Sequence, residues 1–235
     1  MTQSASEAHT GLHRDRAVVA AFDFDGTLTH GGSVWPFLAA LRGTWAVTRA
    51  AAVVLPRLAA AAVVGGHAVD HAKEALFRHT LAGLDAEDAG SRAAAFGAAH
   101  YARRRRLDVA ARVEQHRRQG HLLVVVSASP ELYVGPVADA LAFDAVLATR
   151  LAVGPDGRLT GHYDGRNCRG AEKLRRIRQW IDSYAAGAEL WAYGNSAGDV
   201  PLLRGADVGV DVGRLGPLGK LRSFRRLRDT AGLVG

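Results

Sequence analysis

Short apolar runs, separated by longer segments with helical spacing, dominate the pattern of this chain. Three runs predict buried strands of a parallel sheet: residues 17–24 (AVVAAFDF), 121–127 (HLLVVVS) and 188–194 (AELWAYG). Weaker runs predict two more strands, at residues 144–150 and 206–212. Because segments with helical patterns separate these strands, the sequence predicts an α/β fold with a doubly wound parallel sheet.

Three amphipathic helices are predicted after residue 106. Residues 108–120 place apolar side chains at helical spacing and end on a glycine. Residues 130–141 begin with proline, which suits a first helical turn. Residues 170–187 carry an apolar stripe opposite a basic face, so this helix is expected to cover the sheet.

The segment 31–106 separates the first strand from the others and has no convincing strand pattern. It is alanine-rich, helical in pattern and far too long for an ordinary connection, so it predicts an inserted helical cap. Residues 17–30 and 107–235 would then form the α/β core, and the polar residues 1–16 a flexible tail. Residues 151–165 place two alternating arms around a Pro-Asp-Gly turn and predict a β-hairpin.

Composition and charge narrow the class of protein. The 235 residues are 48% hydrophobic and 23% charged, as in soluble globular proteins. The net charge of +7 raises the question of nucleic acid, but the arginine clusters at 103–106 and 220–229 have few stacking aromatics and no accompanying motif. We therefore expect no nucleic-acid partner. The apolar segment 45–66 is interrupted by two arginines and a proline, so stable membrane insertion is not expected, although peripheral contact with lipid stays open.

Cysteine usage points to a reducing compartment. The one cysteine, Cys168, excludes an internal disulfide, and the polar first residues lack the apolar region of a signal peptide. These features predict a cytoplasmic location. The sequence carries no signal for the oligomeric state.

Polar side chains gather where three of the predicted strands end. Asp23 and Asp25 close the first strand, residues 127–129 (SAS) close the second, and residues 194–199 (GNSAGD) follow the third. The carboxyl ends of parallel strands meet at one edge of a sheet, where ligands of such folds bind. We therefore expect these residues to form one site.

Two carboxylates after an apolar strand have three possible explanations. A calcium loop that begins at Asp23 needs a glutamate at its twelfth position, where this chain has Val34, so that explanation is excluded. A simple turn explains Asp25 and Gly26 but not an aspartate on so apolar a strand. A magnesium phosphoryl-transfer site remains, because Mg²⁺ prefers oxygen ligands and aspartate can act as a nucleophile or a proton carrier.

Four motifs carry a resemblance to a known family. The stretches DFDGTLT, VVVSASPE, GAEK and GNSAGDVPLL occur in this order between residues 23 and 203. Together they resemble the haloacid-dehalogenase (HAD) superfamily of phosphatases. The helical insertion after the first motif is similar to the C1-type cap of the phosphoserine-phosphatase-like branch (subfamily IB). The resemblance implies a Rossmann-like core and Mg²⁺ as cofactor.

The resemblance also implies roles for the acidic and amide side chains. Asp23 would be the nucleophile and a metal ligand, and Asp25 the general acid/base, which also offers its backbone carbonyl to Mg²⁺. Most relatives have an aspartate where this chain has Asn195. We expect Asn195 to bind the metal directly through its amide oxygen, and Asp199 to support it or to bind through water.

The same resemblance implies the residues that bind the substrate. Ser127, Ala128 and Lys173 would hold the phosphoryl group, while Thr27 would help fix the loop after the first strand. Lysine is rare in this chain, so Lys173, near the start of its helix, stands out from the sequence alone.

Other reactive residues have simpler explanations. His67 and His71 are four apart, but a zinc-protease glutamate and a third ligand are both missing, so surface or packing positions are expected. No activating base is identifiable for Cys168. Trp35 is expected to contact the leaving group of the substrate, although aromatics in this segment more often form the core.

These features predict a Mg²⁺-dependent phosphomonoesterase that works through an aspartyl phosphate. Its expected partner is a small phosphorylated metabolite: phosphoserine, another amino-alcohol phosphate, or histidinol phosphate. A phosphotransferase or a lipid-phosphate phosphatase could use the same site. From another class, a basic protein that binds nucleic acid or membrane without catalysis is the remaining alternative.

Overall fold

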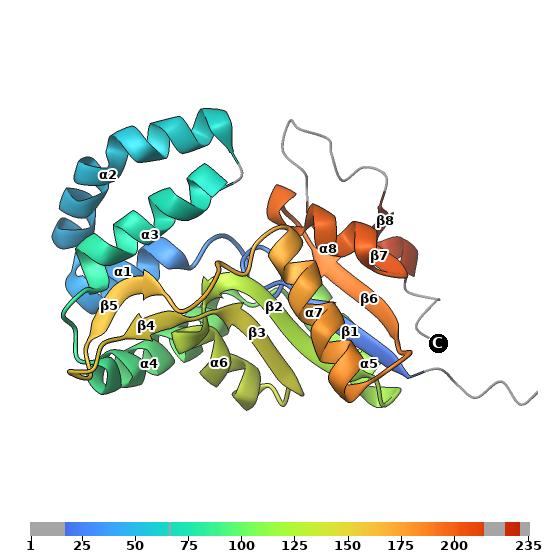
Figure 1. The fold of residues 1–235 in the computed structure, drawn as a ribbon. Coiled ribbons are helices and arrows are strands. Elements are labelled where there is room, and N and C mark those ends of the chain that lie inside the picture. The colour runs from blue at the N-terminus through green and yellow to red at the C-terminus, as the bar shows by residue number, and fades with distance from the viewer. Residues whose placement is uncertain (1–16, 66, 214–223, 231–235) are drawn as a thin grey trace, which may run out of the picture.

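A six-stranded parallel sheet forms the centre of the molecule, in the order β3-β2-β1-β6-β7-β8 (Figure 1). The structure, a computed structural model, describes residues 17–65, 67–213 and 224–230. The strands are β1 (Val18–Phe22), β2 (Leu122–Pro130), β3 (Ala145–Thr149), β6 (Glu189–Gly194), β7 (Val208–Asp211) and β8 (Arg225–Arg226). The predicted α/β fold with a doubly wound parallel sheet is confirmed.

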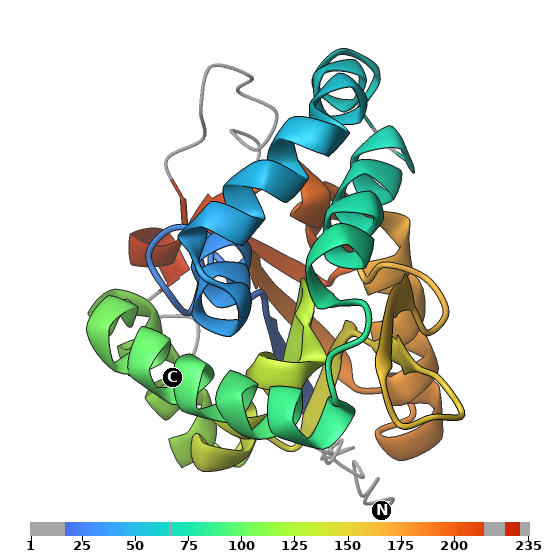
Figure 2. The same cartoon turned by 90° about the vertical axis from the view of Figure 1, so that its left-hand side faces the viewer.

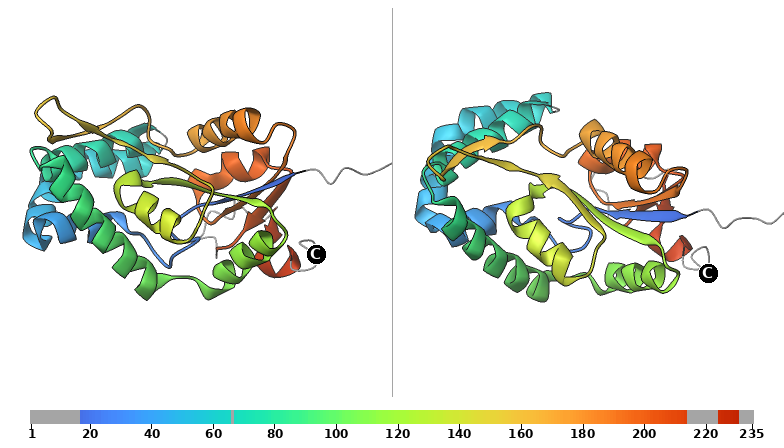
Figure 3. Two further views of the ribbon diagram at one scale, coloured as in Figure 1. Left: turned by 90° about the horizontal axis from the view of Figure 1, so that it is seen from below. Right: turned by 60° about the horizontal axis from the view of Figure 1, so that its bottom comes forward.

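Helices cover both faces of this sheet, as Figure 3 shows. One face packs against α5 (Leu107–Arg118) and α6 (Glu131–Ala140), the other against α7 (Ala171–Tyr184) and α8 (Val200–Gly205). The side chains of β1 pack alternately against the helices on the two faces, because successive side chains of a strand point in opposite directions. β1 is buried on both sides, which explains its unbroken apolar run.

Four helices occupy the chain between β1 and α5. They are α1 (Val34–Arg42), α2 (Thr44–Val64), α3 (His67–Leu81) and α4 (Ala86–Arg104). α2 and α3 pack against each other and project from one end of the molecule (Figures 1 and 2). The start of α4 is fixed by Asp85, whose side chain accepts hydrogen bonds from the backbone of Glu87 and Asp88.

The helical end of the molecule also includes parts of the second half of the chain. The predicted hairpin consists of β4 (Leu151–Val153) and β5 (Leu159–Tyr163), and β5 packs against α3. In turn, α4 lies against α6, so closely that a Cβ on Gly97 would meet the carbonyl oxygen of Tyr133 at 2.7 Å. A cap with the boundaries 31–106 therefore stays a proposal.

The ends of some elements differ from the sequence expectation. The helix expected over residues 170–187 extends over Ala171–Tyr184, and α8 and β8 were not predicted, because both are too short to show a period. The tail at residues 1–16 lies outside the described residues, as does part of the basic segment 220–229. In the part of the chain that the structure describes, no helix is both long and apolar enough to cross a bilayer.

Candidate active site

The ends of three neighbouring strands bring the predicted residues together. Asp23 directly follows β1, Ser127 and Ser129 lie in the last part of β2, and Asn195 follows β6. Because β1 pairs with both β2 and β6, these positions share one edge of the sheet. The predicted clustering at the carboxyl ends of the strands is what the structure shows.

Lys173 joins the two acidic motifs. Its ammonium nitrogen lies 2.5 Å from Oδ1 of Asp23 and 2.6 Å from Oδ1 of Asp199. All three side chains are buried, and Lys173, from the first turn of α7, is 2% exposed. An unpaired buried carboxylate is costly, so this lysine stabilises both acids. Lys173 therefore contacts Asp23, the residue expected from the sequence to be the nucleophile.

The electrostatics of this cluster follow from burial and from its excess of negative charge. Burial raises the pKa of Asp23, and repulsion by Asp199 adds to this, so the pKa lies well above the ordinary range despite Lys173. Burial also opposes ionisation of Asp199, but Lys173 and the donors of Ser196 lower its pKa. For Lys173, burial favours the neutral amine, yet the two carboxylates outweigh it and raise the pKa. The two carboxylates thus carry more charge than Lys173 offsets, and a bound cation would balance the excess.

Asp25 is held by two donors that orient its carboxylate. The backbone N–H of Ser33 donates to Oδ1 at 3.0 Å, and the hydroxyl of Ser129 donates to Oδ2 at 2.7 Å. Ser33 in turn is within 2.6 Å of the hydroxyl of Tyr133. Sequence reasoning noted the SAS stretch but did not assign Ser129, because its partner lies 104 residues away in the chain.

Asn195 packs against the loop that follows Asp25. A Cβ on Gly26 would lie 2.0 Å from Nδ2 of Asn195, and Gly26 has φ +79°, so only glycine fits there. The hydroxyl of Thr27 donates to Oδ1 of Asn195 at 3.4 Å. Asp199 accepts hydrogen bonds from the backbone N–H groups of Asn195 and Ser196, at 3.2 and 2.9 Å. Asp199 therefore supports the loop of Asn195.

The end of β2 offers further polar groups. The hydroxyl of Ser127 accepts a hydrogen bond from the backbone N–H of Ser129 at 3.1 Å. The carbonyl of Ala128 accepts from the ammonium of Lys73 at 2.5 Å and from the hydroxyl of Thr149 at 2.8 Å. The expected phosphate contacts of Ser127 and Ala128 stay a prediction.

Lys73 is a second residue near the site that the sequence did not reveal. It lies on α3, outside every quoted motif, and a second side chain of α3, Asp70, accepts a hydrogen bond from Nδ2 of Asn167 at 2.5 Å. Burial lowers the pKa of Lys73 to about 8, although the charges of Asp25 and Asp70 oppose that shift. Lys73 is one of three lysines in the sequence, which is the one signal that could have drawn attention to it. Together the two contacts hold α3 against the end of β2 and the loop before α7.

The donors at this edge fit magnesium. Mg²⁺ prefers oxygen ligands and few carboxylates, and the side chain of Asp23, the carbonyl of Asp25 and the amide oxygen of Asn195 are such ligands. The carboxylates of Asp23, Asp25 and Asp199 also outnumber the bridging Lys173, a surplus that a divalent cation would balance. Among the described residues no cluster of three His, Cys, Asp or Glu side chains could hold a metal. The expected set contains an amide and a backbone carbonyl, so it would not form such a cluster.

The remaining reactive residues do not join the site. The side chain of His67 is 96% exposed, and His71 is also exposed. Burial raises the pKa of Cys168 to about 11, which keeps its thiol protonated and unreactive. Trp35, 44% exposed at the start of α1, remains the predicted contact of the leaving group.

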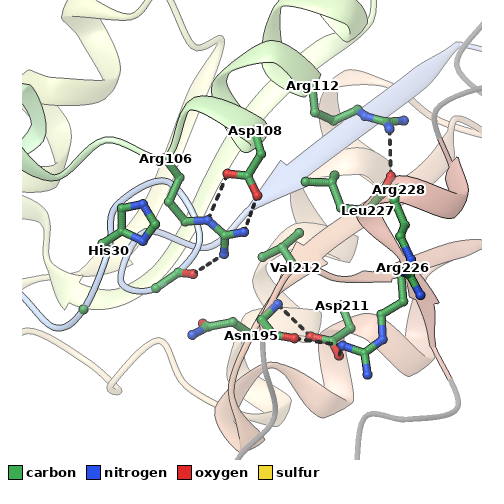
Figure 4. Close-up of a pocket in the computed structure, with 13 residues that line it drawn as sticks. His30, Arg106, Asp108, Arg112, Asn195, Asp211, Val212, Arg226, Leu227 and Arg228 are labelled. Carbon is green, nitrogen blue, oxygen red and sulfur yellow. Dashed lines mark hydrogen bonds and ion pairs between the residues drawn. The ribbon is translucent and has the colours of Figure 1, made fainter.

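A basic cavity of about 960 Å³ adjoins the site (Figure 4). Gly26 and Asn195 form part of its wall, whereas Asp23, Asp25 and Lys173 do not line it. Its arginines are largely engaged: Arg106 pairs with Asp108 and donates to the carbonyl of Gly26, and Arg112 donates to backbone carbonyls (Figure 4). This cavity therefore borders the acidic cluster without containing it.

Comparison with known proteins agrees with this architecture. A family model described as haloacid dehalogenase-like hydrolase matches residues 20–204. Protein CicA of Caulobacter vibrioides is 35% identical over 208 residues, which cover 87% of this chain and 90% of that protein. A histidinol-phosphatase of Neisseria meningitidis serogroup C is 30% identical over 96 residues, which cover 39% of this chain and 43% of that enzyme.

Solved structures show the same fold. A substrate-bound phosphoserine phosphatase has a TM-score of 0.65 at 16% identity, and the match covers 94% of this chain and 99% of that one. The resemblance first seen in four short motifs thus extends over the core and the helical segment. The chain belongs to the haloacid dehalogenase-like hydrolase family and has the fold of its phosphoserine-phosphatase-like members.

Proposed function

We propose that this phosphatase hydrolyses a small phosphomonoester through an aspartyl phosphate on Asp23, with Mg²⁺ bound. The observation that carries the proposal is the arrangement of Asp23 and Asp25 at the sheet edge. The carboxylate of Asp23 is paired with Lys173, while that of Asp25 accepts hydrogen bonds from Ser33 and Ser129. Two acids with different partners suit two different roles.

In the first step Asp23 attacks the substrate. A carboxylate oxygen of Asp23 forms a bond to phosphorus, and the bond from phosphorus to the leaving oxygen breaks. Asp25 donates a proton to that oxygen, which leaves as an alcohol. Lys173 touches the nucleophile, so its charge would also lie close to the phosphoryl oxygens and stabilise the charge that they carry.

In the second step water replaces Asp23. Asp25, now a carboxylate, accepts a proton from a water molecule, whose oxygen attacks phosphorus. The acyl phosphate bond breaks, inorganic phosphate leaves and the Asp23 carboxylate is restored. The hydrogen bonds from Ser33 and Ser129 keep Asp25 in one orientation for both transfers.

Magnesium would be held by the Asp23 carboxylate, the Asp25 carbonyl and the Asn195 amide oxygen, with Asp199 as support. When bound, it supplies positive charge that neutralises the phosphate and the surplus of carboxylates. Asparagine brings no charge, so the affinity for Mg²⁺ should be lower than with an aspartate at this position.

The substrate class follows from the cap that we propose, formed by helices of the segment 31–106 over the site. α3 already reaches the sheet edge through Lys73, so a small metabolite with a polar leaving group suits the space between them. Phosphoserine, another amino-alcohol phosphate and histidinol phosphate remain the candidates, with phosphoryl transfer to another acceptor as the runner-up. A cytoplasmic location belongs to the same proposal. Membership of a hydrolase family overturns the alternative of a non-catalytic basic protein.

Hydrolysis of p-nitrophenyl phosphate tests the proposal. We expect activity that requires Mg²⁺ and that falls to background in Asp23→Asn. The matched control is Asp182→Asn, an exposed position on α7 that should keep full activity. Circular dichroism of both variants establishes that they are folded. Turnover by the Asp23→Asn variant would contradict the covalent mechanism.

A further inference from the structure

α2 presents a long apolar surface to solvent. Large apolar side chains along it are strongly exposed: Trp45 is 74% exposed, Val53 56%, Leu55 60%, Val63 88% and Val64 75%. We call these five residues the outer face of α2. Large exposed apolar patches mark sites of interaction in soluble proteins. Among the described residues, few large apolar side chains elsewhere are comparably exposed.

The side of α2 opposite the outer face packs against the rest of the protein. The outer face itself is not needed for this packing. Val47, Ala50 and Val54 recur at helical spacing and are buried in the core cluster that also contains residues of α1 and α3. Large apolar side chains of a helix are ordinarily buried against another element. Here α2 forms the outer edge of the molecule in Figure 1, so its outer face lacks the cover that its composition predicts.

The charges on α2 indicate what kind of partner would cover it. The helix contains Arg49 and Arg57, both exposed, and no acidic residue. The guanidinium of Arg49 lies 5.5 Å from the centre of the Trp45 ring. Arginine beside tryptophan and aliphatic side chains is typical of helices that lie in the interface of an anionic bilayer.

A cavity beside the outer face adds a place for an anionic group. It has a volume of about 290 Å³ and is lined by Arg42, Trp45, Arg49, Val53 and His79, among others. None of the described residues that line it is acidic. Two guanidinium groups next to an aromatic and an aliphatic side chain match the boundary between a lipid phosphate and its acyl chains.

We propose that the outer face of α2 docks on a membrane surface that contains anionic phospholipid, with a lipid phosphate seated between Arg42 and Arg49. A second copy of the chain fits less well. A two-fold contact through this face would bring Arg49 and Arg57 of both copies together, and α2 offers no acid to offset them. The proposal does not depend on the catalytic function, because none of these residues lies in the proposed active site.

Vesicle flotation of the full chain tests the docking. The vesicles consist of phosphatidylcholine alone or of phosphatidylcholine mixed with phosphatidylglycerol. We expect binding to the mixed vesicles that weakens with salt, and little binding to phosphatidylcholine. Arg49→Glu and the double variant Val53→Glu/Val63→Glu should each weaken binding by roughly tenfold or more, since one removes charge attraction and the other apolar burial.

Matched control variants distinguish binding through the outer face of α2 from binding caused by the net positive charge or by any exposed apolar side chain. Arg103→Glu makes the same charge change at an exposed arginine of α4, and Tyr184→Glu introduces the same acid at an exposed aromatic residue at the end of α7. Both should bind vesicles like the original chain, and hydrolysis of p-nitrophenyl phosphate should be equal in all of them.

Three results would overturn the proposal. The first is absence of binding to the mixed vesicles. The second is equal loss of binding in Arg49→Glu and Arg103→Glu, which would show unspecific charge attraction. The third is a dimer in light scattering that the Val53→Glu/Val63→Glu variant converts to monomer, because the outer face would then bind a second copy.

Discussion

Gly26 connects the two halves of the proposed metal site, because its lack of a side chain lets Asn195 approach the Asp25 loop. Gly26→Ala would combine left-handed strain of about 1–2 kcal/mol with displacement of Asn195, whose Nδ2 lies 2.0 Å from the Cβ position. We expect kcat/KM to fall by roughly a hundredfold, in line with the cost of a misplaced catalytic group.

Gly31 provides the control for this prediction. It also has a positive φ, +76°, but nothing lies within 4 Å of its Cβ position. Gly31→Ala should therefore lower the temperature of thermal unfolding, because of its backbone strain, and keep its phosphatase activity. Equal loss of activity in the two variants would contradict the role that we assign to the approach of Asn195.

At the scale of single residues, the sequence pointed to Asp23, Asp25 and Lys173, which the structure brings to one edge of the sheet, but it did not reveal Ser129 or Lys73. Asp23 and Asp25 were identifiable because carboxylates interrupt an apolar strand. Ser129 and Lys73 were not, since each meets its partner across the fold rather than along the chain. The catalytic and metal-binding roles themselves stay predictions, because contacts alone do not assign them.

Among the elements, α3 brings a lysine from the helical end of the molecule to the site. Lys73→Met would remove its contact with the Ala128 carbonyl and a positive charge near Asp25. We expect KM for a phosphate ester to rise several-fold while kcat changes less. The substitution weakens the packing of α3 over the substrate and does not remove a group that reacts with it. Steady-state kinetics measure the two constants separately.

Arg78→Met is the matched change on the same helix. Arg78 is exposed, so its loss should leave KM as it is in the original chain. An unchanged KM in Lys73→Met, or an equal rise in both variants, would show that Lys73 does not hold α3 over the substrate.

The predictability of the elements depended on the length of their patterns. Five strands of the sheet followed from apolar runs, and α5, α6 and α7 from their helical period. The six-residue α8 and the two-residue β8 are too short to carry a period. The packing of α4 on α6 depends on the close approach at Gly97, which sequence spacing does not reveal.

For the whole molecule, a buried histidine beneath the site links stability to pH. Nε2 of His116 lies 2.7 Å from the hydroxyl of Tyr193, and its Nδ1 lies 2.7 Å from Nδ1 of His121. The backbone carbonyl of Tyr193 accepts the N–H of Asp23. Burial, with the charges of His121 and Arg112, lowers the pKa of His116 to about 3.

This shift destabilises the fold in acid. Above pH 6.5 His116 is neutral in both states, and below it the unfolded chain binds a proton that the folded chain does not. The free energy of unfolding should therefore fall by up to about 1.4 kcal/mol per pH unit between pH 6.5 and 3. Urea unfolding of the original chain and of His116→Gln measures the difference, and an identical pH dependence would contradict it.

In the mechanism that we propose, Asp23 carries the phosphoryl group during turnover. An acyl phosphate is reduced by borohydride to the alcohol, which converts the aspartate into homoserine. We would mix the Mg²⁺-loaded enzyme with substrate, quench it in borohydride and locate the reduced residue by peptide mass spectrometry. We expect homoserine at position 23, and none in Asp23→Asn or without substrate. Reduction at Asp25 instead, or turnover without any reducible aspartate, would contradict it.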